Sequence, residues 1–399
     1  MSEELTTLDD EVGDDLAAST SEASLRRTEA RSAEIEAAIA KDPSGFRVMT
    51  GDRPTGNLHL GHYFGSLANR VRIQNAGVKT FILIADYQVI TDRDGTGPIH
   101  DRVMGMLADY LAIGLDPQRT TFYAHSAVPA LNQLMLPFLS LVTDAELRRN
   151  PTVKAELEAT GDRPMSGLLL TYPVHQAADI LFCKANLVPV GKDQLPHLEQ
   201  TRVVARRFDE RYGRVDPARP IFPQAEALLS KASTVLGLDG TKMSKSKGNV
   251  IEIGMDADTT AKLIKKAVTD SDRHITYDPQ NRPEVSNLVL LASLCTGEDP
   301  VAIADGIGDG GGGGLKKLVT EAVNEFFAPI RARRAELVAD PGYLIGVLRE
   351  GNAHANQVGD ATLAEVRQAM NMNRDPMNSA SLIAKDPFGL SPSKPCAAL

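Results

Sequence analysis

Short apolar runs and helical patterns alternate along the first half of the chain. Residues 80–86 are almost entirely apolar, which is typical of a strand covered on both faces. Residues 46–50 and 120–124 form shorter runs of the same kind, and helical patterns occupy the segments 59–74 and 98–113. This β-α-β-α-β alternation predicts an α/β fold with a doubly wound parallel sheet.

The second half of the chain has a different pattern. Helices are predicted at 256–268, 285–294, 315–335 and 359–370, so we expect a helical C-terminal domain. The glycine-rich segment 306–314 lies between two of these helices, and we interpret it as a flexible connector. It lacks the spacing GxxxxGKS or GxxxxGKT that a phosphate-binding loop of the Walker type requires.

The two ends of the chain are polar. Residues 1–22 have little to bury and are expected to be disordered, whereas residues 23–41 have good helix formers and alternating charge, which predicts a solvated helix. Pro43 then breaks the chain, and the folded body should begin near Phe46. The resulting division is an acidic extension at 1–45, an α/β domain at 46–254, a helical domain at 255–375 and a flexible tail at 376–399.

The composition disfavours several classes of protein. With 42% hydrophobic and 24% charged residues, it is ordinary for a soluble globular protein. No apolar run approaches the roughly 18 residues of a membrane span, and the acidic N-terminus is unlike a secretory signal. Three widely spaced cysteines without a CxxC pair argue against a disulfide framework or a zinc site. We therefore expect a cytoplasmic protein that has no membrane partner.

The net charge of −9 is concentrated at the N-terminus. Residues 1–15 hold seven acidic and no basic residues, so the rest of the chain has 43 basic against 45 acidic residues, a net charge of −2. A nearly neutral body can still carry a basic face. Composition therefore neither supports nor excludes a nucleic-acid partner.

Candidate chemistry begins in the turn after the first strand. Right-handed crossovers place residues 51–61 at the carboxyl edge of the sheet, where ligands bind. A helix start there would offer backbone N–H groups to a phosphate, and Gly61 would let a nucleoside approach closely. His59 and His62 would share one helical face. Ordinary surface histidines and a metal pair are the alternatives, but no other ligand cluster is nearby in the sequence, so no metal site is predicted.

A second candidate is the basic segment Lys242-Met243-Ser244-Lys245-Ser246. Lysines on a mobile loop would stabilise negative charge as it develops on departing pyrophosphate. A solvated face or a non-specific anion patch is the alternative. Taken together and in this order, this segment and His59-Leu60-Gly61-His62 resemble the two signature sequences of class I aminoacyl-tRNA synthetases.

Three further segments make the resemblance specific to tryptophanyl-tRNA synthetases, over about residues 46–370. They are LTYPVHQAADIL at 170–181, VPVGKDQ at 188–194 and AVTDSD at 267–272. The resemblance implies a Rossmann-like catalytic domain, a helical domain that reads the tRNA anticodon, and a homodimer. It also implies ATP with Mg²⁺, L-tryptophan and tRNA(Trp) as participants in the reaction.

The resemblance implies roles for residues at matching positions. Asp179 would accept the indole N–H, which is the only polar group of that ring, while Tyr172 and Gln194 would hold the ammonium group of tryptophan. Further residues implied for the tryptophan pocket are Met49, Gly51, Gln88 and Gln176. The implied catalytic residues are His59, His62, Lys242, Ser244, Lys245 and Ser246. The implied ATP contacts are His62, the whole lysine segment 242–246, Arg53, Pro54, Thr55, Gly61, Gly191, Lys192, Asp193 and Val235.

Several positions depart from the common bacterial pattern. The first signature has histidines where threonine and asparagine are frequent, and Met49, Gln88 and Lys192 replace an aromatic residue, a histidine and an acid. We expect these changes to alter affinity and the response to indole-based inhibitors such as indolmycin, rather than the reaction. The chain also contains no Trp, which would suit an auxiliary enzyme made when tryptophan is limiting, although chance explains it at least as well.

Two other functions stay open at this point. A tyrosyl-tRNA synthetase would share the fold and the reaction, and its pocket uses a pair spaced like Gln176 and Asp179, but the segments AVTDSD and VPVGKDQ favour tryptophan. A non-catalytic synthetase-like protein with a binding or regulatory role would have lost aminoacylation, yet both signatures are intact here. The predicted function is therefore activation of tryptophan by ATP and its transfer to tRNA(Trp).

Overall fold

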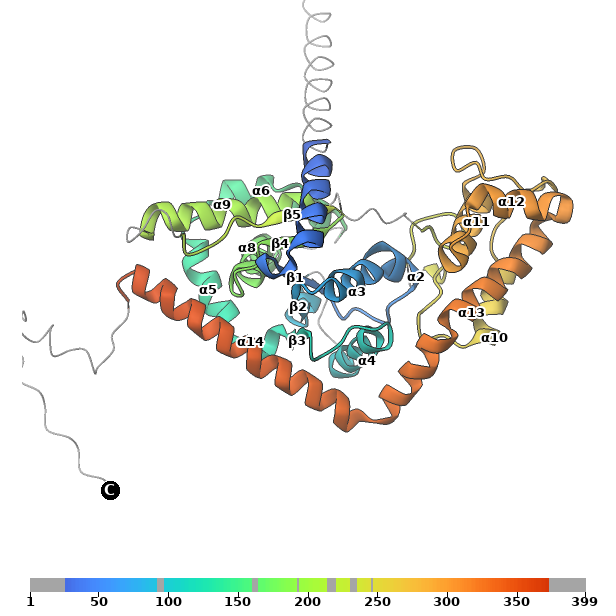
Figure 1. The fold of residues 1–399 in the computed structure, drawn as a ribbon. Coiled ribbons are helices and arrows are strands. Elements are labelled where there is room, and N and C mark those ends of the chain that lie inside the picture. Colours follow the sequence, from blue (N-terminus) through green and yellow to red (C-terminus); the bar gives the residue numbers. More distant parts are fainter. Residues whose placement is uncertain are drawn as a thin grey trace, which may run out of the picture.

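The computed structural model describes residues 26–91, 97–159, 164–191, 194–213, 220–229, 235–244 and 247–372, so the predictions for 1–22 and 376–399 lie outside it. At the centre of the described part lies a five-stranded parallel sheet in the order β3-β2-β1-β4-β5 (Figure 1). Its strands are β1 Arg47–Asp52, β2 Lys79–Ile84, β3 Thr120–Ala124, β4 Leu187–Val190 and β5 Glu226–Leu229. The predicted α/β fold is confirmed. The direction of winding changes between β1 and β4, and open α/β sheets bind ligands at the carboxyl ends of such strands.

Strand β2 shows why helices cover both faces of the sheet. Phe81 and Leu83 pack with α5 (Pro129–Leu139) and α8 (Gly167–Leu181), whereas Ile82 and Ile84 pack with α4 (Ile99–Ala112). Successive strand residues point to opposite faces, so a continuous apolar run is buried on both. The remaining helices of this region are α2 Leu60–His62, a π-helical turn Tyr63–Leu67, α3 Ala68–Asn75, α6 Asp144–Arg149, α7 Pro151–Ala159 and α9 Leu195–Tyr212.

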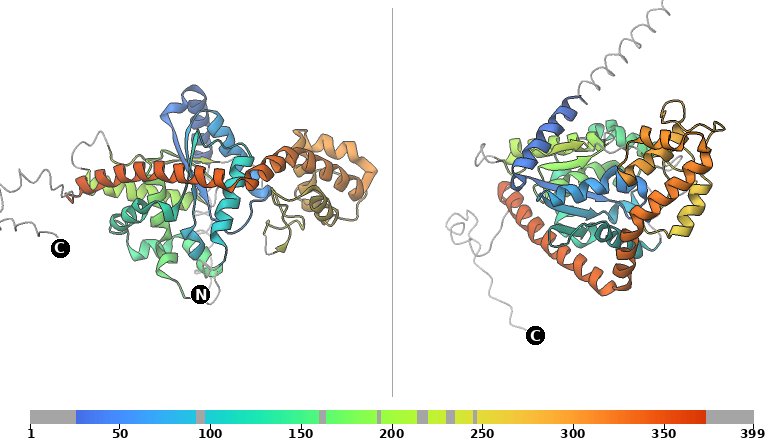
Figure 2. Two further views of the ribbon diagram at one scale, coloured as in Figure 1. Left: turned by 90° about the horizontal axis from the view of Figure 1, so that it is seen from below. Right: turned by 45° about the vertical axis from the view of Figure 1, so that its right-hand side comes forward.

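Beyond the sheet the chain is helical, as predicted. The helices are α10 Ala257–Lys265, α11 Pro283–Thr296, α12 Pro300–Ile307, α13 Gly311–Ala339 and α14 Pro341–Ala369. Helices α10 to α13 lie to one side of the sheet, and α14 turns back along it (Figures 1 and 2). Leu58 and Tyr110 of the sheet region share one hydrophobic core with Phe327 of α13. The two regions are therefore joined by continuous apolar packing.

The glycine-rich segment 306–314 is not the flexible connector that we predicted. It ends α12, forms a short 3-10 turn at Gly308–Gly310 and begins α13. Gly308 and Gly311 have φ angles of +48° and +69°, which favour glycine. A Cβ on Gly312 would lie 2.9 Å from Oγ1 of Thr269. The glycines thus build a tight junction between two helices, and this packing was not visible in the local composition.

Helix α14 is much longer than the predicted 359–370, because it runs along the edge strand β3. Asn352 Oδ1 accepts a hydrogen bond of 3.0 Å from the backbone N–H of Ala124. A Cβ on Gly351 would lie only 1.8 Å from the backbone oxygen of Phe122. The missing side chain lets the helix approach the strand and cover an edge that would otherwise be open to pairing.

The predicted N-terminal helix is present at residues 26–41, but the expectation that it is solvated is wrong for one face. Ile35 and Ile39 are each 3% exposed and pack in a cluster with Val48 of β1. Charged residues of the helix also contact the body, since Arg31 pairs with Glu226 of β5 and Glu36 pairs with Arg72 of α3. The folded body therefore begins well before Phe46.

Among the described residues, no single helix is long and apolar enough to cross a membrane. One bent pair, Pro283–Thr296 with Pro300–Ala339, meets the length and composition requirement only when its members are combined across an angle of 114°.

Candidate active site

A cavity of about 530 Å³ lies at the carboxyl ends of β1, β2 and β4. The predicted site residues in its wall are Met49, Gly51, Arg53, His62, Gln88, Tyr172, Gln176, Asp179, Gly191 and Gln194. Helix α8 brings Tyr172, Gln176 and Asp179 to the cavity together, because residues three or four positions apart share a helical face. The structure thus gathers residues from four separate segments of the sequence around one space.

The histidine segment lies beside the chain that follows the lysine segment. The backbone N–H of Leu60 donates to the oxygen of Ile251 at 3.0 Å, and His59 forms an isolated antiparallel bridge with Glu252. The ring centroids of His59 and His62 lie 3.7 Å apart, and Nδ1 of His62 accepts a hydrogen bond of 3.1 Å from the backbone N–H of His59. The two histidines therefore lie together at the helix start, as the spacing predicted.

The lysine segment meets the histidine segment through Met243. A Cβ added to Gly61 would lie 2.8 Å from Sδ of Met243, so the thioether packs directly on this glycine. Asn249 holds the segment in place, since its Oδ1 accepts a hydrogen bond of 2.8 Å from the N–H of Ser244 and its Nδ2 donates to the oxygen of Lys242 at 3.2 Å. The fold thus joins two signatures that lie about 180 residues apart in the sequence.

The other predicted ATP contacts are distributed differently. Pro54 and Val235 are buried, and Val235 belongs to the core that joins the sheet to the helical region. The N–H of Thr55 donates to the oxygen of Arg53 at 2.8 Å, which tightens the turn after β1. The predicted site residues that lie outside the described part of the chain are Lys192, Asp193, Lys245 and Ser246.

A buried ion pair supports the cavity wall beneath this turn. Asp52 pairs with Arg70, with Nη2 of the arginine 3.1 Å from Oδ1, and the hydroxyl of Tyr110 donates to Oδ2 of the same carboxylate. Burial alone would raise the pKa of Asp52, but Arg70 and Tyr110 outweigh it, so the pKa is lowered. The carboxylate therefore stays ionised in the cavity wall.

Asp179 is at the centre of a buried polar cluster. Nε2 of His125 lies 2.6 Å from its Oδ1, and the two side chains are 0% and 4% exposed. The rings of His125 and His175 stack with centroids 4.5 Å apart. Gln88 Nε2 lies 3.0 Å from Nδ1 of His175, and Gln88 Oε1 accepts a hydrogen bond of 2.7 Å from Thr91. Burial, helped by nearby His125, lowers the pKa of His175 although Asp179 opposes this, so the ring is held neutral.

Two further residues of the cavity wall contact predicted site residues. Nε2 of His197 lies 3.4 Å from the hydroxyl of Tyr172, and burial raises the pKa of Tyr172. Oε1 of Glu156 lies 3.2 Å from Nη2 of Arg53. Both His197 and Glu156 line the cavity. The wall therefore presents both hydrogen-bond donors and acceptors to the cavity.

Comparison with known proteins decides the family. The family model described as tRNA synthetases class I (W and Y) matches residues 41–328. The chain belongs to this family. A tryptophan–tRNA ligase of Streptococcus pyogenes serotype M3 is 42% identical over 82% of this chain and 98% of its own length. A tryptophan–tRNA ligase of Treponema pallidum is 40% identical over 83% of this chain and 98% of its own length.

Solved structures agree with this assignment to the class I synthetases. Tryptophanyl-tRNA synthetase from Campylobacter jejuni, complexed with ADP and tryptophan, is 30% identical with a TM-score of 0.71, covering 82% of this chain and 99% of that one. Tyrosyl-tRNA synthetase from Archaeoglobus fulgidus is 21% identical with a TM-score of 0.56, covering 75% of this chain and 93% of that one, and shows the common fold alone. The Rossmann-like class I fold that the resemblance implied is confirmed.

In this synthetase a buried carboxylate ties the helical region to the histidine segment. Asp109 of α4 is 1% exposed and pairs with Arg334 of α13. Its Oδ2 also lies 3.4 Å from the backbone N–H of Leu58, directly before the histidines. Burial raises the pKa of Asp109 even beside this arginine. The position of the signature turn therefore depends on a helix that lies far away in the sequence.

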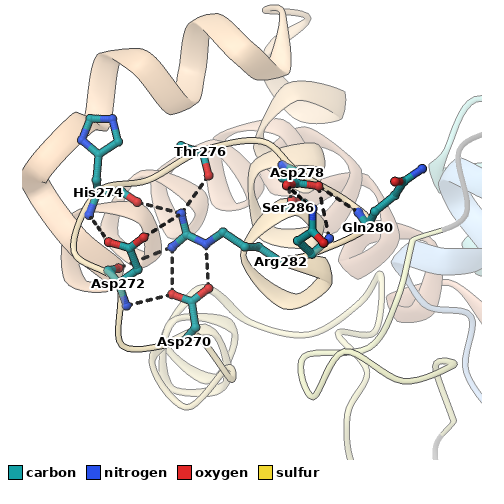
Figure 3. Close-up of polar contacts among 9 residues, drawn as sticks. Asp270, Asp272, His274, Thr276, Asp278, Gln280, Arg282 and Ser286 are labelled. Carbon is teal, nitrogen blue, oxygen red and sulfur yellow. Dashed lines mark hydrogen bonds and ion pairs between the residues drawn. The ribbon is translucent and has the colours of Figure 1, made fainter.

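The AVTDSD segment of the synthetase is organised by Arg282 (Figure 3). Nε and Nη2 of Arg282 donate to the two oxygens of Asp270 at 2.7 and 2.8 Å, and Nη1 donates to the oxygen of His274 at 2.7 Å. The hydrogen bonds from Arg282 lower the pKa of Asp270. The N–H of Val268 donates to the oxygen of Leu238 at 2.8 Å, which ties this segment to the loop before the lysines.

His125 is the site residue whose omission from the sequence analysis matters most. It directly follows β3, and a histidine at the carboxyl end of a parallel strand is a usable sequence signal. Arg70, Glu156 and His197 gave no such signal, because they lie within helices and their partners belong to other elements.

Proposed function

We propose that this synthetase activates L-tryptophan with ATP, forming tryptophanyl-adenylate and diphosphate, and transfers the tryptophanyl group to the 3′ end of tRNA(Trp) with release of AMP. The observation that carries the proposal is the 42% identity to a tryptophan–tRNA ligase over 98% of that relative's length. The cavity supports it, because a buried acceptor and a set of polar groups line a space of suitable size.

We assign the indole ring to the part of the cavity beside Asp179. An indole has a single polar group, which is a donor, and an ionised carboxylate only accepts. Tyr172 and Gln194, which line the same cavity, would hold the ammonium group of tryptophan. Met49, Gly51, Gln88 and Gln176 would form the rest of the tryptophan pocket.

ATP would bind between the two signature segments. The backbone N–H groups at the start of α2 suit phosphate oxygens, and His59 and His62 could donate to them. Met243 now packs on Gly61, so the thioether must move before a nucleoside can contact this glycine. This supports a lysine loop that rearranges when ATP binds. The remaining ATP contacts in the proposal are Arg53, Pro54, Thr55, Gly191, Lys192, Asp193 and Val235.

The first step would be in-line attack of the tryptophan carboxylate on the α-phosphate, with pyrophosphate leaving. Lys242 and Lys245 would stabilise the charge that develops on pyrophosphate, with Ser244 and Ser246 completing the loop contacts. Mg²⁺ would enter with ATP and neutralise part of the phosphate charge. Positioning and electrostatics would supply most of the catalysis, without a protein nucleophile.

The proposal also covers the whole protein. We assign recognition of the tRNA anticodon to the helical domain at 255–375 and a homodimer as the working unit. We expect the reaction to take place in the cytoplasm, where translation consumes charged tRNA. We also propose an auxiliary, indolmycin-insensitive type of enzyme. The change at Gln88 bears on the response to the inhibitor, and the absence of Trp suits an enzyme made when tryptophan is limiting.

ATP–pyrophosphate exchange, measured with each amino acid separately, tests the proposal. We expect exchange with tryptophan alone, followed by charging of a tRNA(Trp) transcript. Exchange with tyrosine would reassign the pocket while keeping the fold and the mechanism. No exchange with any amino acid, in protein shown to be folded, would point to a non-catalytic member of the family.

A further inference from the structure

The carboxylate of Asp179 belongs to two environments. The residue lines the cavity, whereas His125, which holds its Oδ1 at 2.6 Å, is fully buried and is not part of the cavity wall. Among the described residues, no other group forms a hydrogen bond with the side-chain carboxylate of Asp179. A ligand in the cavity would therefore meet a carboxylate whose orientation is set from behind by one histidine.

The ring of His125 is itself held in one orientation. It stacks on His175 at 4.5 Å with an interplanar angle of 18°, and on Tyr87 at 6.3 Å with an angle of 25°. His175 is anchored in turn by Gln88, at 3.0 Å. Stacking and hydrogen bonding thus restrict the rotation of both imidazoles, and so restrict the direction from which Nε2 approaches the carboxylate.

The protons in this cluster follow from its contacts. A carboxylate that accepts a hydrogen bond from a ligand on one oxygen can also accept one on the other, and in that arrangement Nε2 of His125 carries the hydrogen and donates it to Oδ1 of Asp179. The amide nitrogen of Gln88 donates to Nδ1 of His175, because Oε1 of Gln88 accepts from Thr91. One oxygen of Asp179 is thereby bound to His125, and the carboxylate still has a second oxygen that can accept a hydrogen bond from a ligand in the cavity that it lines.

We propose that His125 is a positioning residue that sets the specificity of the cavity for an aromatic ring bearing an N–H donor. It acts through Asp179, by fixing the carboxylate so that the second oxygen meets the ring N–H without reorganisation. A substrate that lacks this donor leaves a buried acceptor unpaired and is rejected. The inference rests on the proposed function, because it takes tryptophan as the ligand.

A metal ion is the alternative reading of the cluster, since ligand atoms of His125, His175 and Asp179 lie within 4.8 Å of one another. The distances favour the hydrogen bond. Tetrahedral bonds of roughly 2.0–2.1 Å to one ion hold two ligand atoms about 3.3 Å apart, whereas Nε2 of His125 and Oδ1 of Asp179 are 2.6 Å apart. Gln88 also occupies Nδ1 of His175, which leaves Nε2 of that ring as its one candidate ligand atom.

The test compares tryptophan with β-(benzothiophen-3-yl)alanine, in which sulfur replaces the indole N–H. Pyrophosphate exchange on the full-length wild type should favour tryptophan. His125→Ala should lower kcat/KM for tryptophan about tenfold, mainly through KM, while the value for the analogue changes less than about threefold. His125→Gln keeps a side-chain donor and should recover most of the preference. Because the preference is a ratio of two substrates, partial unfolding of a variant cancels out of it.

The matched control is His274→Ala, since His274 also pairs with an aspartate, Asp309, at 2.8 Å but is exposed and away from the cavity. It should keep the wild-type preference. Equal losses for both substrates in His125→Ala, or a glutamine variant no better than alanine, would overturn the proposal. Tryptophan binding that is abolished by a chelator in the absence of ATP and Mg²⁺ would assign the cluster to a metal instead. A wild type that does not activate tryptophan would refute the proposed function itself.

Discussion

His175 and Asp52 show how burial and partners together set the charge of single residues in the synthetase. Asp52 lines the cavity and is partly buried, whereas His175 is buried beside Gln88 of the cavity wall. Asp52 keeps its charge because Arg70 and Tyr110 stabilise the carboxylate. His175 stays neutral because burial dominates, and its neighbour Gln88 donates to the unprotonated nitrogen. The cavity thus has a stable pattern of charges and donors before any ligand arrives.

At this scale we predict that His175 makes the protein sensitive to mild acid. The pKa of His175 in the folded protein lies below its unfolded value of 6.5. Below pH 6.5 the unfolded chain therefore binds a proton at this ring more readily than the folded protein does. The associated stability is present above pH 6.5 and is lost as the pH falls toward the folded pKa. Denaturant titrations from about pH 7 to 5.5 should give a steeper loss of unfolding free energy in the wild type than in His175→Gln. Equal slopes would contradict the assignment.

At the scale of elements, the position of α14 depends on a glycine. Its lack of a side chain lets the helix lie against the edge strand β3. The backbone of Gly351 lies against Phe122 of β3, and Oδ1 of Asn352 accepts a hydrogen bond from the backbone N–H of Ala124 in the same strand. Glycine normally weakens a helix interior. In α14 the packing of Gly351 against β3 offsets this cost in helix stability. The same contact explains why this long helix lies along the edge of the sheet.

We predict that Gly351→Ala destabilises the synthetase by about 3 kcal/mol, because its Cβ would lie 1.8 Å from the oxygen of Phe122 and the helix must move away. Gly346→Ala in the same helix is the matched control, since a Cβ there meets nothing within 4 Å. It should be neutral or stabilise by about 0.5–1 kcal/mol. Chemical denaturation of the two variants measures the contrast, and similar values for both would refute this role for Gly351.

At the scale of the whole molecule, the helical region and the sheet region behave as one packed body. Their apolar residues form a shared core, and Arg334 reaches from α13 to the buried Asp109 beside the signature turn. A shift of α13 in the helical region can therefore move the signature turn through the contact between Arg334 and Asp109. This arrangement offers a physical route between the helical region and the cavity at the sheet.

We predict that Arg334→Met costs about 3 kcal/mol of stability, because it leaves Asp109 buried without its cation. The exposed neighbour Arg333→Met is the control and should change stability by less than about 0.5 kcal/mol. Adding Asp109→Asn to the arginine variant should recover part of the loss, since the unpaired charge is removed. Denaturant unfolding curves measure the free energy of unfolding of each variant. If the loss in the double variant equals the sum of the losses in the two single variants, Arg334 and Asp109 do not interact directly.

The apolar run at 80–86 and the alternation around it were enough to predict the parallel sheet, because strand and helix periodicities are local properties of the chain. The two signatures were equally readable, since residue types at close spacing define their chemistry. Even so, the sequence placed the boundary of the folded body too late. It could not show that Ile35 and Ile39 would be covered by the sheet.

Tertiary structure alone decided which distant residues meet. His125 lies 54 positions before Asp179, and nothing local to either residue specifies their hydrogen bond. The glycines at 306–314 look like a linker until Thr269 packs on them. Periodicity and motif chemistry depend on residues that are close in the sequence. The sequence by itself therefore determined the sheet, the helical half of the chain and the two signature segments. Contacts between elements depend on the packed arrangement of the whole chain, so only the structure could reveal what orients each side chain of the cavity.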